Sequence, residues 1–294
     1  METNDLLMRS LMFVPAHNEK LMVSASNSSA DILLLDIEDS VQPIENKQIA
    51  RDNIKAFIES GKFENRVLFP RINDRESGQL LKDVMQLTID GVSGFMYPKS
   101  KRGEDVYFFD KLLETVEYEK GIEKGTFKII PLIETASAVL NVEEICRASD
   151  RVVAIAYGSE DFITDLEGIH DYAHTSLFTP RAIIAMGARA AGVIPIDTVH
   201  IRVHDLEDLE KNLIVSKNLG FEGMLVLHPK ELDLVHSYFS PSEKEIADAR
   251  EMLDLAKEAE SKGLGVAIRN GKFIGPPMIK KALKIIEKHS LINN

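Results

Sequence analysis

The chain has 294 residues, of which 44% are hydrophobic, and its formal net charge of −12 comes without a Lys/Arg cluster of nucleic-acid type. Binding to a nucleic-acid phosphate backbone is therefore excluded as its main role. No apolar run reaches the ~18 residues of a membrane span, and the acidic N-terminus lacks the pattern of a secretory signal. Its one cysteine, Cys146, cannot form an internal disulfide, so we expect a cytoplasmic protein that binds neither nucleic acid nor membrane.

Strand-like apolar runs alternate with helical patterns over the first 240 residues. We predict strands at residues 10–14, 32–35, 66–70, 92–97, 127–133, 152–156, 196–201 and 223–227. Helical patterns lie between them, for example at residues 46–58, 78–87, 104–120, 138–148, 180–191, 206–218 and 230–238. Nearly continuous apolar strands separated by helices favour a parallel sheet covered on both faces. Eight such units predict an α/β fold of the (β/α)₈ TIM-barrel type, and no Gly-rich dinucleotide fingerprint follows the first strand.

The remaining residues exceed what a barrel needs and predict a C-terminal helix–hairpin–helix arm. Ser240-Pro-Ser-Glu243 opens a helix that runs to about Ser261, and Asn270-Gly271 is a hairpin turn signal before a last helix at residues 278–288. We therefore expect two domains, a barrel of residues 1–240 and an arm of residues 241–294. The arm would cover the barrel mouth or a neighbouring subunit.

The ribbon of this arm also predicts a homo-oligomer. It carries four apolar side chains that a lone barrel would leave in water, namely Val266, Ile268, Phe273 and Ile274. Placing the arm on a neighbouring subunit would bury them.

Acids follow two neighbouring predicted strands at the point where each ends. Glu134 comes directly after residues 127–133, and Glu160-Asp161 come shortly after residues 152–156. Residues just after the strands of a barrel share one pocket. Mg²⁺ takes oxygen ligands and often only one or two protein carboxylates, and Mn²⁺ accepts the same oxygens. The acids therefore predict a site for one divalent cation, although each acid alone could be an ordinary helix N-cap.

The other strand ends carry further polar residues. His17, the Asp36-Ile-Glu38-Asp39 run, Arg71, Lys99, Asp197 and His228 all lie close to predicted strand boundaries. The planar guanidinium of Arg71 matches a carboxylate or the paired oxygens of a 2-keto acid. Its alternative role is a salt bridge that holds Glu38 or Asp36. We interpret Lys99 as solvated rather than as a Schiff-base lysine, and His228 as a turn residue.

Taken in order, these motifs resemble the citrate lyase β-subunit family, within the HpcH/HpaI aldolase superfamily of Mg²⁺-dependent acyl-CoA lyases and aldolases. The similarity spans roughly residues 9–288, with motifs beginning at Arg9, Leu35, Arg71, Ile133, Gly158, Ile196, Gly220 and His228. The resemblance implies a barrel with a C-terminal arm, assembled as a homotrimer or hexamer. It implies cleavage of a 3-hydroxyacyl-CoA, such as citryl-, malyl- or citramalyl-CoA, into an acyl-CoA and a 2-keto acid.

The resemblance also implies roles for single residues. Mg²⁺ would be held by Glu134 and Asp161, and Arg71 would steady the substrate carboxylate and the developing enolate. Contacts to coenzyme A would come from Lys20, Arg51 and Asp197. We further predict a catalytic role for Glu38 and a substrate-binding role for Asp36.

One departure from the family pattern concerns proton transfer. Acyl-CoA lyases of this family carry an Asp before the Pro of the last hairpin, where this chain has Gly275. We therefore predict that His17 handles the proton, because histidine titrates near neutrality. Two alternatives stay open: a metal-dependent aldolase that releases pyruvate or oxaloacetate from a free hydroxy-keto acid, and a lyase-complex subunit that needs partner chains.

Overall fold

The computed structural model describes residues 6–171, 174–263, 267–269 and 272–293. The chain divides into two compact units. The larger is Met8–His236, and the smaller combines Met1–Leu7 with Ser237–Asn294. No helix among the described residues is long and apolar enough to cross a membrane.

The larger unit is built on eight parallel strands. They are β1 (Ser10–Pro15), β2 (Ile32–Asp36), β3 (Val67–Leu68), β4 (Gly94–Tyr97), β5 (Lys128–Ile133), β6 (Ala154–Tyr157), β7 (Ile194–Asp197) and β8 (Gly223–Val226), in the order β3-β2-β1-β8-β7-β6-β5-β4. Backbone hydrogen bonds span the remaining gap, since Met96 donates to the Pro70 carbonyl and Ser93 to the Leu68 carbonyl, each at 3.0 Å. The sheet is thus a nearly closed barrel, which confirms the predicted (β/α)₈ fold.

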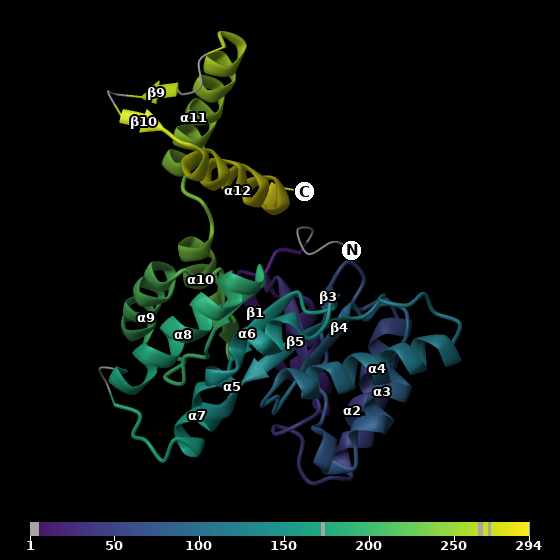
Figure 1. Ribbon diagram of the computed structural model, residues 1–294. Helices are drawn as coiled ribbons and strands as arrows, with labels where there is room; N and C mark the ends of the chain where they lie inside the picture. The colour runs from purple at the N-terminus through teal and green to yellow at the C-terminus, as the bar shows by residue number, and fades with distance from the viewer. Residues whose placement is uncertain (1–5, 172–173, 264–266, 270–271, 294) are drawn as a thin grey trace. The chain divides into compact units, whose positions relative to one another are not determined.

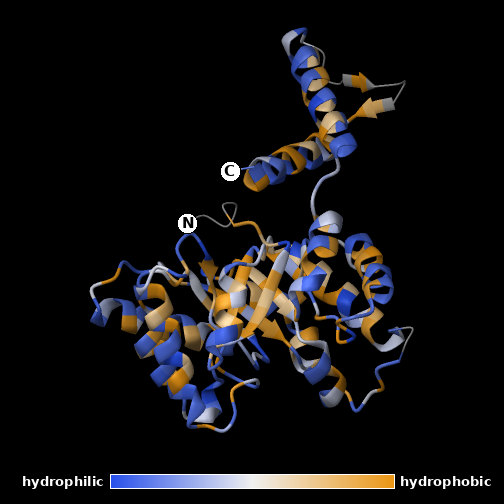
Figure 2. Cartoon of the chain, turned by 180° about the vertical axis from the view of Figure 1, so that it is seen from behind, coloured by the Kyte–Doolittle hydropathy of each residue, from blue (hydrophilic) through white to orange (hydrophobic). Residues whose placement is uncertain are grey.

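Helices surround the strands (Figure 1). They are α1 (Glu19–Ser26), α2 (Asn46–Glu59), α3 (Leu80–Leu87), α4 (Gly103–Glu119), α5 (Ala136–Leu140), α6 (Val142–Arg147), α7 (Ser159–Asp165), α8 (Thr175–Ala191), α9 (Leu206–Leu219) and α10 (Leu232–Phe239), with short 3₁₀ turns η2 (Arg75–Ser77) and η3 (Pro229–Glu231). The strands are largely apolar and the helices mix apolar and polar residues (Figure 2). This pattern follows because the strands are buried on both faces, whereas each helix buries one.

Most strand boundaries lie within two residues of the prediction, and the third and seventh strands differ most. The seventh strand is β7, Ile194–Asp197, so Asp197 ends this strand rather than beginning it. The Asp197 carboxylate binds Arg181 and accepts a hydrogen bond from the Thr198 N–H at 2.9 Å, where the chain leaves the sheet. The third strand shortens to Val67–Leu68, because Pro70 has no N–H to continue its ladder.

The smaller unit contains the helix–hairpin–helix. It comprises α11 (Glu243–Ser261), the antiparallel strands β9 (Ala267–Arg269) and β10 (Lys272–Ile274), and α12 (Pro276–Asn293). Ile274 is 2% exposed and packs against Ala259, so the prediction of a wet Ile274 is wrong. Ile268 and Phe273 are 65% and 59% exposed. Val266 and the predicted Asn270-Gly271 turn lie outside the described residues.

Candidate active site

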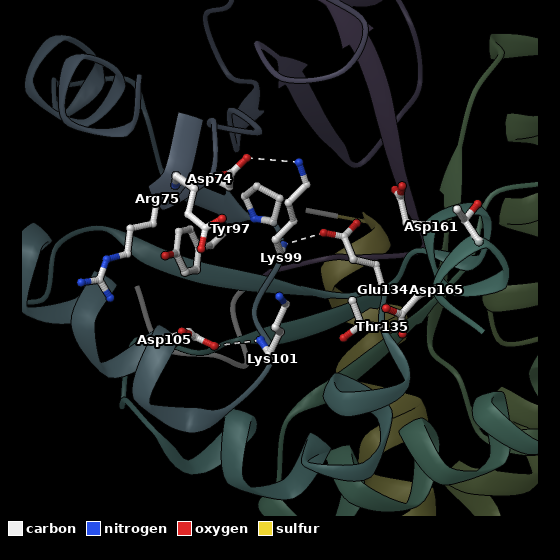
Figure 3. A pocket seen from close by; sticks show the side chains of 13 residues that line it. Asp74, Arg75, Tyr97, Lys99, Lys101, Asp105, Glu134, Thr135, Asp161 and Asp165 are labelled. Atoms are coloured by element: carbon white, nitrogen blue, oxygen red, sulfur yellow. Dashed lines mark hydrogen bonds and ion pairs between the residues drawn. The ribbon is translucent and has the colours of Figure 1, made fainter. Parts of the chain in front are cut away.

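A cavity of about 620 Å³ lies beside the carboxyl ends of β4, β5 and β6 (Figure 3). Glu134 and Asp161, the two acids predicted to bind metal, both line it. The other lining residues are Asp74, Arg75, Glu76, Tyr97, Pro98, Lys99, Lys101, Asp105, Thr135, Thr164 and Asp165. The size suits a small-molecule ligand.

Glu134 is the buried acid of this cavity, 2% exposed and directly after β5. Its Oε1 accepts a hydrogen bond from the Lys99 backbone N–H at 2.5 Å. Gly158 leaves room for this side chain, since a Cβ there would lie 2.9 Å from the Glu134 Cβ. Burial, together with the negative charge of Glu38, raises the pKa of Glu134 to about 8.

Asp161 enters the same cavity from the first turn of α7, the helix that follows β6. It is solvent-exposed, and β6 pairs directly with β5, the strand that carries Glu134. Among the residues that the structure describes, the buried Glu134 forms no ion pair, and a divalent cation between the two acids would supply the missing charge partner. Groups of three or more His, Cys, Asp or Glu suited to metal are absent from the described residues. The pair therefore fits a hard ion such as Mg²⁺, which keeps ligand positions for water and substrate.

Arg71 is the centre of a buried ionic cluster near the cavity. It donates two hydrogen bonds to the Asp36 carboxylate, from Nε at 2.7 Å and from Nη2 at 2.8 Å. Its Nη1 lies 3.1 Å from Glu38 and 3.2 Å from Asp39. Burial acts to raise the pKa of Asp36, but the charge and hydrogen bonds of Arg71 hold that pKa below its ordinary value. Arg71 is 9% exposed and is not among the residues that line the cavity.

Lys99 joins this cluster to the cavity, a role that the sequence did not indicate. Its ammonium lies 3.1 Å from Glu38 and 3.1 Å from Asp74, and its backbone adopts a left-handed conformation with φ of 54°. Burial acts to lower the pKa of Lys99, but the charge of Glu38 raises it above the ordinary value. Lys99 therefore stays protonated, which agrees with its rejection as a Schiff-base lysine. Its side chain is 48% exposed, as expected of a solvated lysine, but it also forms two ion pairs that the sequence did not indicate.

Glu38 is the acid shared by both cations. It is 4% exposed, and burial, opposed by Arg71, raises its pKa to about 7. Lys47, another residue that sequence reasoning missed, fixes the loop around it. The buried Lys47 ammonium donates to the carbonyls of Ile37 and Glu38, each at 3.0 Å.

Two of the predicted coenzyme A contacts are buried in ion pairs instead of lining the cavity. Arg51 is 2% exposed and donates from Nε to Asp83 at 2.6 Å. Asp197 is fully buried against Arg181 of α8. These partners occupy both side chains, so the structure does not bring either one to the site.

The remaining predicted residues lie near β1. Lys20 is exposed in the first turn of α1. His17 is half-buried after the end of β1, and its buried Nδ1 has no hydrogen-bond partner among the described residues. Neither residue lines the cavity. His228 caps η3 by accepting from the Lys230 N–H at 3.1 Å, as expected of a turn residue.

Comparison with known proteins places this arrangement in a family. The model of the HpcH/HpaI aldolase/citrate lyase family matches residues 9–229. The citrate lyase subunit beta of Haemophilus influenzae is 30% identical over 282 residues, which cover 96% of this chain and 97% of that protein. The L-malyl-CoA/beta-methylmalyl-CoA lyase of Cereibacter sphaeroides is 31% identical over 306 residues, covering 97% of this chain and 95% of that protein.

Solved structures agree with the fold. The CitE protein from Mycobacterium tuberculosis, in complex with magnesium, acetoacetate and coenzyme A, matches with a TM-score of 0.72 at 23% identity, covering 97% of this chain and 99% of that one. A citrate lyase from Burkholderia xenovorans matches with a TM-score of 0.83 at 18% identity, covering 97% and 92%. At these identities the likeness concerns the fold alone.

Proposed function

Because the chain belongs to the HpcH/HpaI aldolase/citrate lyase family, we propose that it is a Mg²⁺-dependent lyase that cleaves a carbon–carbon bond in a 3-hydroxyacyl-CoA. The products would be an acyl-CoA and a 2-keto acid, with citryl-, malyl- and citramalyl-CoA as the candidate substrates. The observation that carries this proposal is the pair Glu134 and Asp161, which line one cavity from two adjacent strand ends.

In this proposal Glu134 and Asp161 hold Mg²⁺ or Mn²⁺. The bound ion supplies Lewis-acid stabilisation of the oxygen charge that develops as the bond breaks. The chain's own contribution begins with the Lys99 N–H, which fixes one oxygen of Glu134 and leaves the other available. Buried behind Gly158, the carboxylate has little freedom to turn. The ligand is thus held in place before substrate arrives.

We propose that Arg71 acts through its positive charge, and that Glu38 and His17 act by taking up or releasing protons. Arg71 stays cationic beside Asp36 and keeps a fixed positive charge in the buried cluster near the cavity. The pKa of Glu38, raised to about 7, lets it hold or release a proton near neutral pH. We assign His17 to proton transfer, since Gly275 offers no acid from the arm and the His17 Nδ1 has a vacant hydrogen-bonding position among the described residues.

For the coenzyme, we propose Lys20 as the contact, because its side chain is exposed and not buried in an ion pair with a described residue. Asp36, Arg51 and Asp197 are engaged by arginine or aspartate partners, which favours structural roles for them. We propose a homotrimer or hexamer as the assembly, supported by the exposed Ile268 and Phe273.

A metal-dependent aldolase acting on a free hydroxy-keto acid is the second candidate. Gly275 favours it, because the arm then lacks the acid that acyl-CoA lyases use. A third candidate, favoured by the similarity to citrate lyase subunit beta, is a subunit that is active only with its partner chains.

One assay separates the three candidates. Purified protein is incubated with each acyl-CoA and with free hydroxy-keto acids, with Mg²⁺ or with EDTA, and keto-acid release is measured. We expect Mg²⁺-dependent cleavage of an acyl-CoA. Cleavage of free acids alone would select the aldolase, and inactivity without added partner chains would select the complex subunit.

Two substitutions test the metal ligands in that assay. Glu134→Gln and Asp161→Asn should each lower the rate at least ~100-fold, about 3 kcal/mol of barrier, because each removes a charged ligand. Glu143→Gln, an exposed acid of α6 paired with Arg147, is the matched control and should leave the rate unchanged. Full activity in either ligand variant would refute the proposed site.

A further inference from the structure

The charge balance of the cavity raises the question of how an anionic substrate is held there. Six acids and three cations line it, so its wall is negative before any metal binds. Two of the cations are already engaged. Lys99 lies between Glu38 and Asp74, and the guanidinium of Arg75 stacks 4.4 Å from the centre of the Phe108 ring.

Lys101 is the third cation, and its ammonium forms no hydrogen bond or ion pair with any residue that the structure describes. Its position is nevertheless fixed through its backbone. The Lys101 N–H donates to the Asp105 carboxylate at 2.9 Å. The Lys101 carbonyl accepts from Ser137 of α5 and from Asn141, the residue that follows α5, each at 3.4 Å. The loop between β4 and α4 is thus attached on both sides and presents an uncommitted lysine to the cavity (Figure 3).

Arg71 cannot take over this role without losing its present partners. It is 9% exposed, and its nitrogens are engaged by Asp36, Glu38 and Asp39. Lys101 is therefore the cation that is available to bind a negatively charged group of a ligand in the cavity. Two negative groups so placed would be held by different partners, one by the metal and one by the lysine.

Building on the proposed function, we propose that Lys101 is a specificity-determining residue that binds a second carboxylate on the keto-acid half of the substrate. The chain would then prefer substrates that release a keto-dicarboxylic acid, such as oxaloacetate from citryl-CoA. Citramalyl-CoA, which releases pyruvate, has a methyl group where citryl-CoA has a carboxymethyl group. The two thioesters are therefore a matched pair that differs by one carboxylate.

Binding to the Mg²⁺-loaded protein is the first test. Freshly dissolved oxaloacetate and pyruvate are titrated by calorimetry into the wild type, Lys101→Met and Lys101→Arg. Lys101→Met should weaken oxaloacetate about 10-fold or more, equal to about 1.4 kcal/mol, and change pyruvate less than ~2-fold. Lys101→Arg should restore most of the oxaloacetate affinity, because it restores the charge. Lys211→Met, which removes an exposed lysine from α9, is the charge-matched control and should change neither affinity.

Kinetics with the matched thioesters give a second readout. In Lys101→Met, kcat/KM should fall about 10-fold for citryl-CoA, mainly through KM, and stay constant for citramalyl-CoA. Equal losses on both thioesters, or an unchanged preference for oxaloacetate over pyruvate, would overturn the proposal for Lys101. If Lys101→Met weakened free coenzyme A instead, the lysine would bind a phosphate and the carboxylate assignment would be wrong.

These outcomes also separate the two proposals. A wild type that cleaves none of citryl-, malyl- and citramalyl-CoA, with or without partner chains, refutes the lyase function, while the binding titration still tests Lys101. A wild type that cleaves both citryl- and citramalyl-CoA but is insensitive to Lys101→Met keeps the function and refutes the specificity role. Failure of both keto acids to bind with Mg²⁺ overturns the Lys101 proposal as well.

Discussion

Burial determines which charged residues of this site can meet a ligand. Arg71 and Asp36 are 9% and 1% exposed, and their bidentate pair holds the ends of neighbouring strands together. Such a pair is costly to break, because removal of one partner leaves a buried charge alone. Lys101, in contrast, is exposed and carries an uncommitted ammonium among the described residues. The buried pair shapes the site, and the exposed lysine is available for recognition.

At this scale the sequence predicted which residues gather at the strand ends but not how they pair. Glu134 and Asp161 were found because each follows a buried apolar run. Lys99 was placed at a strand end but interpreted as solvated, and Lys101 was not singled out, because a Pro-Lys-Ser-Lys segment looks solvated in a sequence. The left-handed φ of 54° at Lys99, which turns its N–H onto Glu134, depends on tertiary packing that no local pattern encodes.

Replacement of His17 tests its proposed role in proton transfer. If it transfers the proton, His17→Ala should lower kcat at least ~100-fold while KM changes little, because general acid–base catalysis contributes about that much. His228→Ala is the matched control, since His228 follows the end of β8 and caps η3. It should cost about 1 kcal/mol of stability and leave kcat within a few-fold. A lyase rate within a few-fold of wild type in His17→Ala would show that His17 is not the proton-transfer residue.

Buried ion pairs join the elements of the barrel. Arg51 of α2 holds Asp83 of α3, and Asp83 in turn accepts from the Asn73 N–H at 2.8 Å. Arg181 of α8 holds Asp197 at the end of β7. The apolar runs of the sequence predicted the strands well because parallel strands bury both faces. Strand ends were less predictable, because pairs such as Arg181–Asp197 join residues whose proximity requires the folded helix.

Replacement of Asp197 tests how much the Arg181–Asp197 pair stabilises the barrel. Asp197→Asn should lower the free energy of unfolding by about 3 kcal/mol, because it leaves the buried Arg181 without its counter-charge. Urea unfolding monitored by circular dichroism would measure this loss. Glu207→Gln removes an exposed partner of Lys211 on α9 and should cost less than about 1 kcal/mol. If Asp197→Asn kept wild-type stability but raised KM for the acyl-CoA, Asp197 would instead be the coenzyme contact first predicted.

For the whole molecule, the C-terminal unit has one apolar face packed and another exposed. Ile274 packs against Ala259, Met252, Leu255 and Ile279 and anchors the hairpin within its own unit. Its neighbour Phe273 points to the opposite face of the strand and is 59% exposed. Ile268 and Leu283 are also exposed, at 65% and 55%. The sequence predicted the helix–hairpin–helix but not this division, because adjacent apolar residues in β10 look alike until one is packed.

The exposed face predicts how assembly should respond to charge. We expect the wild type to sediment as a homotrimer or hexamer at micromolar concentration, and Phe273→Asp to shift it toward the monomer, because a buried charge in an apolar contact is costly. Since Phe273 lies opposite the packed Ile274, the substitution should leave the hairpin folded. Tyr118→Asp, at an 88% exposed aromatic residue of α4, is the control and should leave the mass unchanged. A monomeric wild type, or an assembly indifferent to Phe273→Asp, would contradict an interface through the arm and would leave the barrel alone to form the site.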